Sequence, residues 1–147
     1  MSRFQYTEAQ GMAGIPGMLP FIPLTLLHTG DGVHITARMT VPALVDSGAT
    51  VNVLPRDIGE QMGLEWKSLQ AILPSAGTIR RRPALALPLF VKVPQLAPQR
   101  LLFAWSELST HDHMAVLLGQ TKFFDEYYVD FRKPDGYFDI VLKGGTG

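Results

Sequence analysis

The chain has 147 residues, of which 46% are apolar and 18% are charged, and it contains no cysteine. Thirteen basic and thirteen acidic side chains give a formal net charge of zero, so no basic excess suggests binding to nucleic acid or to an anionic membrane. The absence of cysteine excludes disulfides and thiolate zinc sites, and the length predicts a single domain with its own core.

Residues 1–17 are polar and then rich in glycine, with Gly11, Gly14 and Gly17 around Pro16. We predict that this segment is a flexible leader that buries little. It lacks the basic start and apolar core of a secretory signal. The apolar stretch at residues 18–27 contains two prolines and is too short to span a bilayer. The sequence therefore predicts a soluble, cytoplasmic protein without membrane insertion.

Short apolar runs separated by turn residues predict a mostly β chain. The first two strands are expected at residues 21–27 and 33–41, joined by a turn that contains the hairpin-favouring pair Asp31-Gly32. Pro42 is expected to end the second strand. Further strands are expected at 84–93, 101–105, 114–119, 128–131 and 137–142, short helices at 56–62 and 121–127, and a hairpin tip at 73–79.

Asp46 is the most informative residue of the chain. The apolar run 43–45 leads into an Asp-Ser-Gly turn, and a second apolar run follows at once. A carboxylate between two strand-like segments is costly unless it is paired or hydrogen-bonded. Aspartic peptidases pair two such carboxylates, so we interpret Asp46 as half of a catalytic dyad. Because the chain contains this turn once, the other half would come from a second copy.

Two motifs carry a resemblance to a known family. The sequence Leu-Val-Asp-Ser-Gly-Ala-Thr at residues 44–50 continues into Asn-Val-Leu-Pro, and Leu-Leu-Gly follows at residues 117–119. In type and order they resemble the retroviral-type (retropepsin-like) aspartic peptidases, particularly the single-domain bacterial and ubiquitin-shuttle branch. The resemblance covers residues 19–142. It implies a closed β-barrel of the acid protease fold with one or two short helices, forming half of a two-fold dimer. The expected domain spans residues 18–143, and 144–147 form a frayed tail.

The resemblance also implies an activity, which is hydrolysis of peptide bonds by an aspartic endopeptidase. Two close carboxylates share one proton, so one activates a water molecule and the other protonates the scissile carbonyl oxygen. This chemistry needs no metal or cofactor. The resemblance assigns roles to four groups of residues. They are the catalytic Asp46, the supporting turn of Ser47, Gly48, Ala49 and Thr50, the substrate-binding flap of Ser75, Ala76, Gly77 and Thr78, and the loop of Leu117, Leu118 and Gly119.

Several positions depart from the family pattern. Ala49 lacks the hydroxyl that many two-lobed members place beside the carboxylate, so we expect activity to reach mildly acidic or near-neutral pH. Thr50 and Gln120 stand where viral members carry an acidic residue and an arginine. The flap has one glycine rather than several. The C-terminal hairpin 128–142 exceeds the single terminal strand of the viral proteins, and we expect it to build the dimer interface.

Other signals leave alternatives open. The His-Asp-His sequence at residues 111–113 is interpreted as a solvated turn rather than a zinc site, which needs further ligands. Three arginines at 80–82 are interpreted as a solvated arm of the flap. The alternative is that they select substrates with acidic residues beside the cleavage site. The expected partners are a second copy and a peptide or protein substrate, without nucleic acid. The alternative function is a non-catalytic dimeric module that binds a peptide or a protein.

Overall fold

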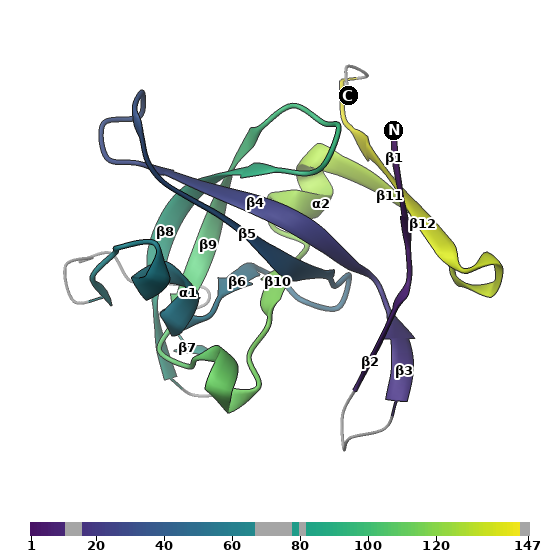
Figure 1. The fold of residues 1–147 in the computed structure, drawn as a ribbon, viewed down its shortest axis with the longest axis horizontal. Coiled ribbons are helices and arrows are strands. Elements are labelled where there is room, and N and C mark those ends of the chain that lie inside the picture. Colours follow the sequence, from purple (N-terminus) through teal and green to yellow (C-terminus); the bar gives the residue numbers. More distant parts are fainter. Residues whose placement is uncertain (11–15, 67–77, 80–81, 145–147) are drawn as a thin grey trace.

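The computed structural model describes residues 1–10, 16–66, 78–79 and 82–144, which form a mostly β structure with a closed six-stranded barrel and two short helices (Figure 1). No helix within these ranges is long and apolar enough to cross a membrane. The elements are β1 (Ser2–Gln5), β2 (Thr7–Gln10), β3 (Pro16–Leu19), β4 (Phe21–Thr29), β5 (Ile35–Val45), β6 (Asn52–Leu54), α1 (Arg56–Gln61), β7 (Thr78–Ile79), β8 (Arg82–Lys92), β9 (Gln99–Ser106), β10 (Val116–Leu118), α2 (Phe123–Glu126), β11 (Tyr127–Arg132) and β12 (Tyr137–Leu142), with short 3-10 turns at Thr110–Asp112 and Lys133–Asp135.

The barrel runs in the order β4-β5-β10-β6-β9-β8 and closes because β8 also pairs with β4. Closure removes most of the free sheet edge, and the alternate side chains of the strands fill the interior. In β5, for example, Val41, Ala43 and Val45 are buried while their neighbours are less so. The expected mostly β barrel with short helices is therefore present.

The hairpin of β4 and β5 corrects one expectation. β5 does not end at Pro42 but continues to Val45, and Pro42 lies opposite Pro23 of β4. Both prolines are exposed. A proline fits a β-ladder where its missing N–H would point away from the partner strand. The chain can therefore pass through Pro42 and deliver residue 46 directly from a long strand.

The N-terminal segment differs from the predicted leader. β1 pairs with β12, so that Ser2 lies opposite Ile140, and Tyr6 belongs to the buried core. The ring of Phe4 stacks on Phe138 with centroids 5.6 Å apart. β2 pairs with β3 in a separate two-stranded ribbon. The interpretation of residues 1–17 as a flexible leader that buries little is wrong for the part that the structure describes, because a distant strand supplies the partner.

β1, β12 and β11 form a three-stranded sheet, called here the terminal sheet, in the order β1-β12-β11. The expected antiparallel pairing of the last two strands is confirmed. Phe138 and Ile140 point into the core and are fully buried. On the other face, Arg3 makes a two-point ion pair with Asp139 at 2.8 and 3.0 Å. The terminal sheet thus joins both ends of the chain beside the barrel (Figure 1).

The helices agree with the local signals of the sequence more closely than the predicted hairpin tip does. α1 follows Pro55 and ends near Gly63, whose φ of +85° suits a glycine, as expected. α2 is shorter than the predicted 121–127. In the arm formed by β7 and β8, Thr78 lies opposite Pro83 and Ile79 lies opposite Arg82. Positions 78 and 79 of the predicted hairpin tip therefore belong to a strand. Residues 73–77 and 145–147 lie outside the described residues.

Candidate active site

Asp46 lies at the first position after β5, where the strand leaves the barrel. Its backbone N–H donates to the carbonyl oxygen of Leu118 in β10 at 2.9 Å. One residue earlier, the N–H of Val45 donates to the carbonyl of Pro20 at 3.0 Å. Backbone contacts on both sides therefore fix the point at which the carboxylate emerges.

The Asp-Ser-Gly turn orients the carboxylate. Oδ1 of Asp46 accepts the N–H of Gly48 at 2.9 Å, and the carbonyl of Asp46 accepts the N–H of Ala49 at 3.1 Å. A Cβ on Gly48 would lie 3.2 Å from Oδ1, so glycine allows the close approach. Asp46 is half-buried, and no other described residue hydrogen-bonds its second carboxylate oxygen. That oxygen is available to a ligand.

β10 brings the Leu-Leu-Gly motif beside this turn. The strand lies between β5, which it pairs in parallel, and β6, which it pairs antiparallel. Leu118 is the register partner of Val45, and Leu117 is the partner of Val53. The two motifs, distant in sequence, are therefore neighbours in space (Figure 1).

At Gly119 the chain passes close to the backbone of residues 49–51, a place called here the crossing, and there is no room for a side chain. A Cβ there would lie 2.5 Å from the carbonyl oxygen of Val51 and 2.7 Å from that of Ala49. Both contacts are with backbone, which cannot move aside as a flexible side chain could. The chain must therefore carry glycine where β10 leaves the sheet.

Asn52 is a site residue to which the sequence analysis gives no role. It is fully buried at the start of β6. Its Oδ1 accepts the N–H of Gly119 at 2.8 Å, and its Nδ2 donates to the carbonyls of Leu102 and Thr121 at 3.1 and 3.2 Å. The only sequence signal is a polar residue that opens an apolar run. Asn52 ties the crossing to β9 and to the chain after β10.

Gln120 supports the turn but does not pair with the side chain of Thr50. Its Nε2 donates to the carbonyl of Ser47 at 2.7 Å, and its backbone N–H donates to the carbonyl of Ala49 at 2.9 Å. The carbonyl of Thr50 accepts the N–H of Thr121 at 2.9 Å. Neutral groups thus hold the turn through its backbone, and the Ser47 residue remains exposed.

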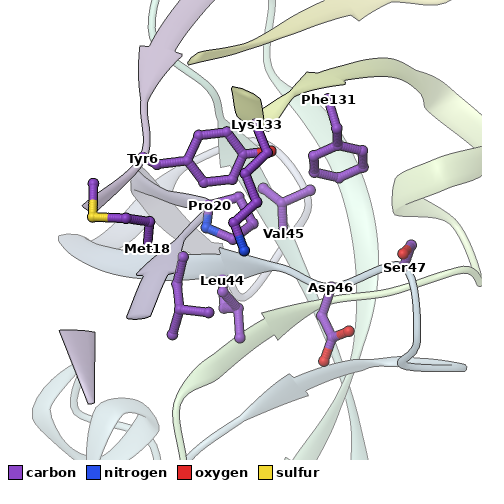
Figure 2. A pocket seen from close by; sticks show the side chains of 10 residues that line it. Tyr6, Met18, Pro20, Leu44, Val45, Asp46, Ser47, Phe131 and Lys133 are labelled. Carbon is purple, nitrogen blue, oxygen red and sulfur yellow. The ribbon is translucent and has the colours of Figure 1, made fainter. Parts of the chain in front are cut away.

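A pocket of about 420 Å³ opens beside Asp46 (Figure 2). The N-terminal segment, the end of β5 and the terminal hairpin supply its walls, which are mainly apolar. Asp46 is the only acid and Lys133 the only base among the lining residues. These residues are Tyr6, Met18, Leu19, Pro20, Leu44, Val45, Asp46, Ser47, Phe131 and Lys133. Sequence reasoning missed the walls because they come from segments that it placed outside the site.

The remaining predicted site residues lie elsewhere or outside the described part. Ser75, Ala76 and Gly77 of the predicted flap fall outside it, and Thr78 belongs to β7. The His-Asp-His sequence forms a 3-10 turn capped by Ser109, which confirms the interpretation as a turn. Within the described ranges, no group of three or more potential metal ligands comes together.

Comparisons of the chain with protein-family models, with curated proteins and with solved structures gave no match.

Proposed function

We propose that the chain is one subunit of a homodimeric aspartic endopeptidase in which each copy contributes Asp46. The observation that carries the proposal is the setting of this carboxylate. One oxygen accepts the N–H of Gly48, the other is unbonded by the described residues, and Asp46 lines a pocket with several apolar side chains. A carboxylate oxygen that is free at the edge of a pocket can accept a proton from water or from a ligand.

The chemistry follows from two such groups that share one proton. The ionised carboxylate accepts a proton from water while the water oxygen bonds to the peptide carbonyl carbon. The protonated carboxyl group gives its proton to the carbonyl oxygen. In the second step the C–N bond breaks, the nitrogen gains a proton from one carboxyl group, and the other regains one from the tetrahedral hydroxyl. The dyad ends as it began, with one proton.

The free edge of the terminal sheet supports a two-fold dimer. β11 is the outer strand of that sheet and pairs only with β12 within the described part of the chain. Tyr128 is 65% exposed and Phe131 is 39% exposed on it. An edge strand whose backbone N–H and C=O groups are not paired on one side can pair with another strand. Phe131 also lines the pocket at Asp46, so an interface along β11 would lie next to the catalytic turn.

The alternative is a non-catalytic module that binds an extended peptide. The same apolar pocket and the same free strand edge favour it, because strand addition needs only backbone partners and apolar pockets. The pocket of each chain also contains one acidic residue, so a single subunit does not carry a pair of carboxylates there. The two functions differ in turnover and not in binding.

The deciding experiment measures cleavage of a diverse peptide mixture from pH 3 to 8 by mass spectrometry. Wild-type protein is compared with Asp46→Asn and with the control Asp31→Asn, which changes an exposed acid in the β4–β5 turn. We expect Asp46→Asn to lower turnover at least about 1000-fold and the control to retain it. Cleavage by none of the three, from folded dimeric protein, would favour the binding module.

A second experiment tests the dimer. Turnover per subunit should fall on dilution below the dimer dissociation constant, because each copy supplies one carboxylate. Tyr128→Glu should raise that constant, measured by analytical ultracentrifugation. Val33→Glu, at a 77% exposed position in the loop between β4 and β5, is the matched control. An unchanged dimer in Tyr128→Glu would argue against the β11 interface.

A further inference from the structure

Lys133 is the single base that lines the pocket at Asp46. It opens the 3-10 turn Lys133–Asp135, which connects β11 with β12. Figure 2 shows its side chain extending from the terminal hairpin across the pocket, toward the side where Leu44 lies. The terminal hairpin thus delivers a positive charge to a pocket whose other charge is the carboxylate of Asp46.

Within the part of the chain that the structure describes, the charge of Lys133 is not used in an ion pair. The neighbouring Arg132 pairs with Asp130, and Arg3 pairs with Asp139. Among the described residues, none forms an ion pair with Lys133 within 4.0 Å. A flexible ammonium over an apolar pocket is therefore available to an anionic group of a ligand.

The residues that line the pocket limit what that ligand can be. Leu44, Pro20 and Phe131 present apolar surface, which suits an aliphatic stem. An anionic group close to Asp46 would be repelled, whereas one that reaches Lys133 would be attracted. The occupant should therefore combine a stem of more than one methylene with a terminal carboxylate. Among the common amino acids, glutamate fits this description better than aspartate.

We propose that this pocket is a specificity subsite for a glutamate side chain of the peptide, and that Lys133 is the specificity-determining residue. The proposal rests on the proposed function, because it takes the peptide to lie against Asp46. Lys133 is exposed, and exposed ion pairs contribute modestly. We therefore expect a preference for glutamate over glutamine of about two- to fivefold at one substrate position.

The first test uses a pool of random decapeptides cleaved by four proteins: wild type, Lys133→Met, Lys133→Glu and the control Lys143→Met. Residue frequencies around the cleaved bonds are read by mass spectrometry. Wild type and control should favour glutamate at one position, Lys133→Met should lose that preference, and Lys133→Glu should favour lysine or arginine there. If Lys133→Met keeps the glutamate preference, another cation, such as one of the arginines at 80–82, would be its cause. That result would overturn the proposal.

The second test separates this proposal from the proposed function. Immobilised Asp46→Asn protein, with or without Lys133→Met or Lys143→Met, captures peptides from the same pool. Enrichment of glutamate that Lys133→Met abolishes would support the subsite even if wild type cleaves nothing. Equal enrichment with all three proteins would overturn the subsite and leave the peptidase intact. If folded protein neither cleaves nor captures peptides, both proposals fail.

Discussion

The crossing at Asp46 and the terminal sheet are neighbours built in opposite ways. At the crossing, backbone groups and one buried amide hold the chain, and Gly119 leaves no space for a methyl group. In the terminal sheet, side chains reinforce the backbone ladders, through the stacking of Phe4 on Phe138 and the ion pair of Arg3 with Asp139. Asp46 thus lies where backbone contacts hold the chain, whereas part of the pocket wall, with Phe131, lies on the terminal sheet.

This contrast predicts different responses to substitution. Changes at the crossing should cost stability at every pH, because they disturb neutral backbone contacts. Substitutions in the terminal sheet should lower the free energy of unfolding by less. At the ion pair of Arg3 with Asp139, their effect should also depend on pH. The following variants test that difference, in order of decreasing expected effect.

Gly119→Ala should have the largest effect. Its methyl group would meet two carbonyl oxygens at 2.5 and 2.7 Å, so the crossing must open. We expect a loss of about 3 kcal/mol or more in the free energy of unfolding, measured by urea titration. Gly30→Ala, where a Cβ meets nothing within 4 Å, should change it by less than about 0.5 kcal/mol. Equal effects of the two would refute the steric argument.

Asn52→Leu should have the second-largest effect on stability. The substitution keeps the branching of the side chain but leaves the N–H of Gly119 and the carbonyls of Leu102 and Thr121 without the partners that Asn52 supplies. We expect the free energy of unfolding to fall by about 2–3 kcal/mol in the same titration. Thr40→Val, which removes a hydroxyl from an exposed pair, is the control and should cost less than about 0.5 kcal/mol. A tolerated Asn52→Leu would mean that the crossing does not depend on the amide.

Asp139→Asn should have a smaller effect that depends on pH. The hydrogen bond from Arg3 lowers the pKa of Asp139 below its ordinary value of 3.8. The pair therefore stabilises the fold fully above that value, and the contribution is lost as the pH falls through the lower folded pKa. Wild type should be more stable than Asp139→Asn at pH 7, and the difference should shrink below about pH 4. Melting temperatures across pH 2–7 measure it, and a constant difference would contradict the assignment.

Tyr127→Phe should have the smallest effect and the opposite sign. The residue is 2% exposed, and its buried hydroxyl has no hydrogen-bond partner among the described residues. Burial raises its pKa, so the hydroxyl stays neutral at physiological pH. Its removal should leave stability unchanged or raise it by up to about 1 kcal/mol. The exposed Tyr128→Phe serves as the control, and a loss in Tyr127→Phe alone would indicate a bridging water.

Elements with local signals could be predicted from the sequence. Asp31-Gly32 marks the first hairpin, and Pro55 and Gly63 bracket α1, because turn and cap residues act over a few positions. The Asp-Ser-Gly turn and the Leu-Leu-Gly strand could also be found, although their pairing through β10 depends on the whole barrel. Pro42 misled the prediction because its effect depends on where the partner strand lies.

The remaining site residues depend on contacts that no local pattern records. Residues 2–5 look like part of a leader because their partner strand, β12, is distant in sequence. Tyr6, Phe131 and Lys133 meet only once that pairing brings them to Asp46. Asn52 is similar, since three separate backbone segments give it its role.

The pairing of β1 with β12 also closes a long loop of chain, because Ser2 and its register partner Ile140 are far apart in the sequence. The entropic cost of loop closure grows with loop length, so this contact is more costly to form than the hairpin of β4 and β5. The same pairing positions the pocket wall that carries Phe131 and Lys133. The pocket beside Asp46 should therefore be complete only after this long-range contact has formed, which is a slow kind of step in folding.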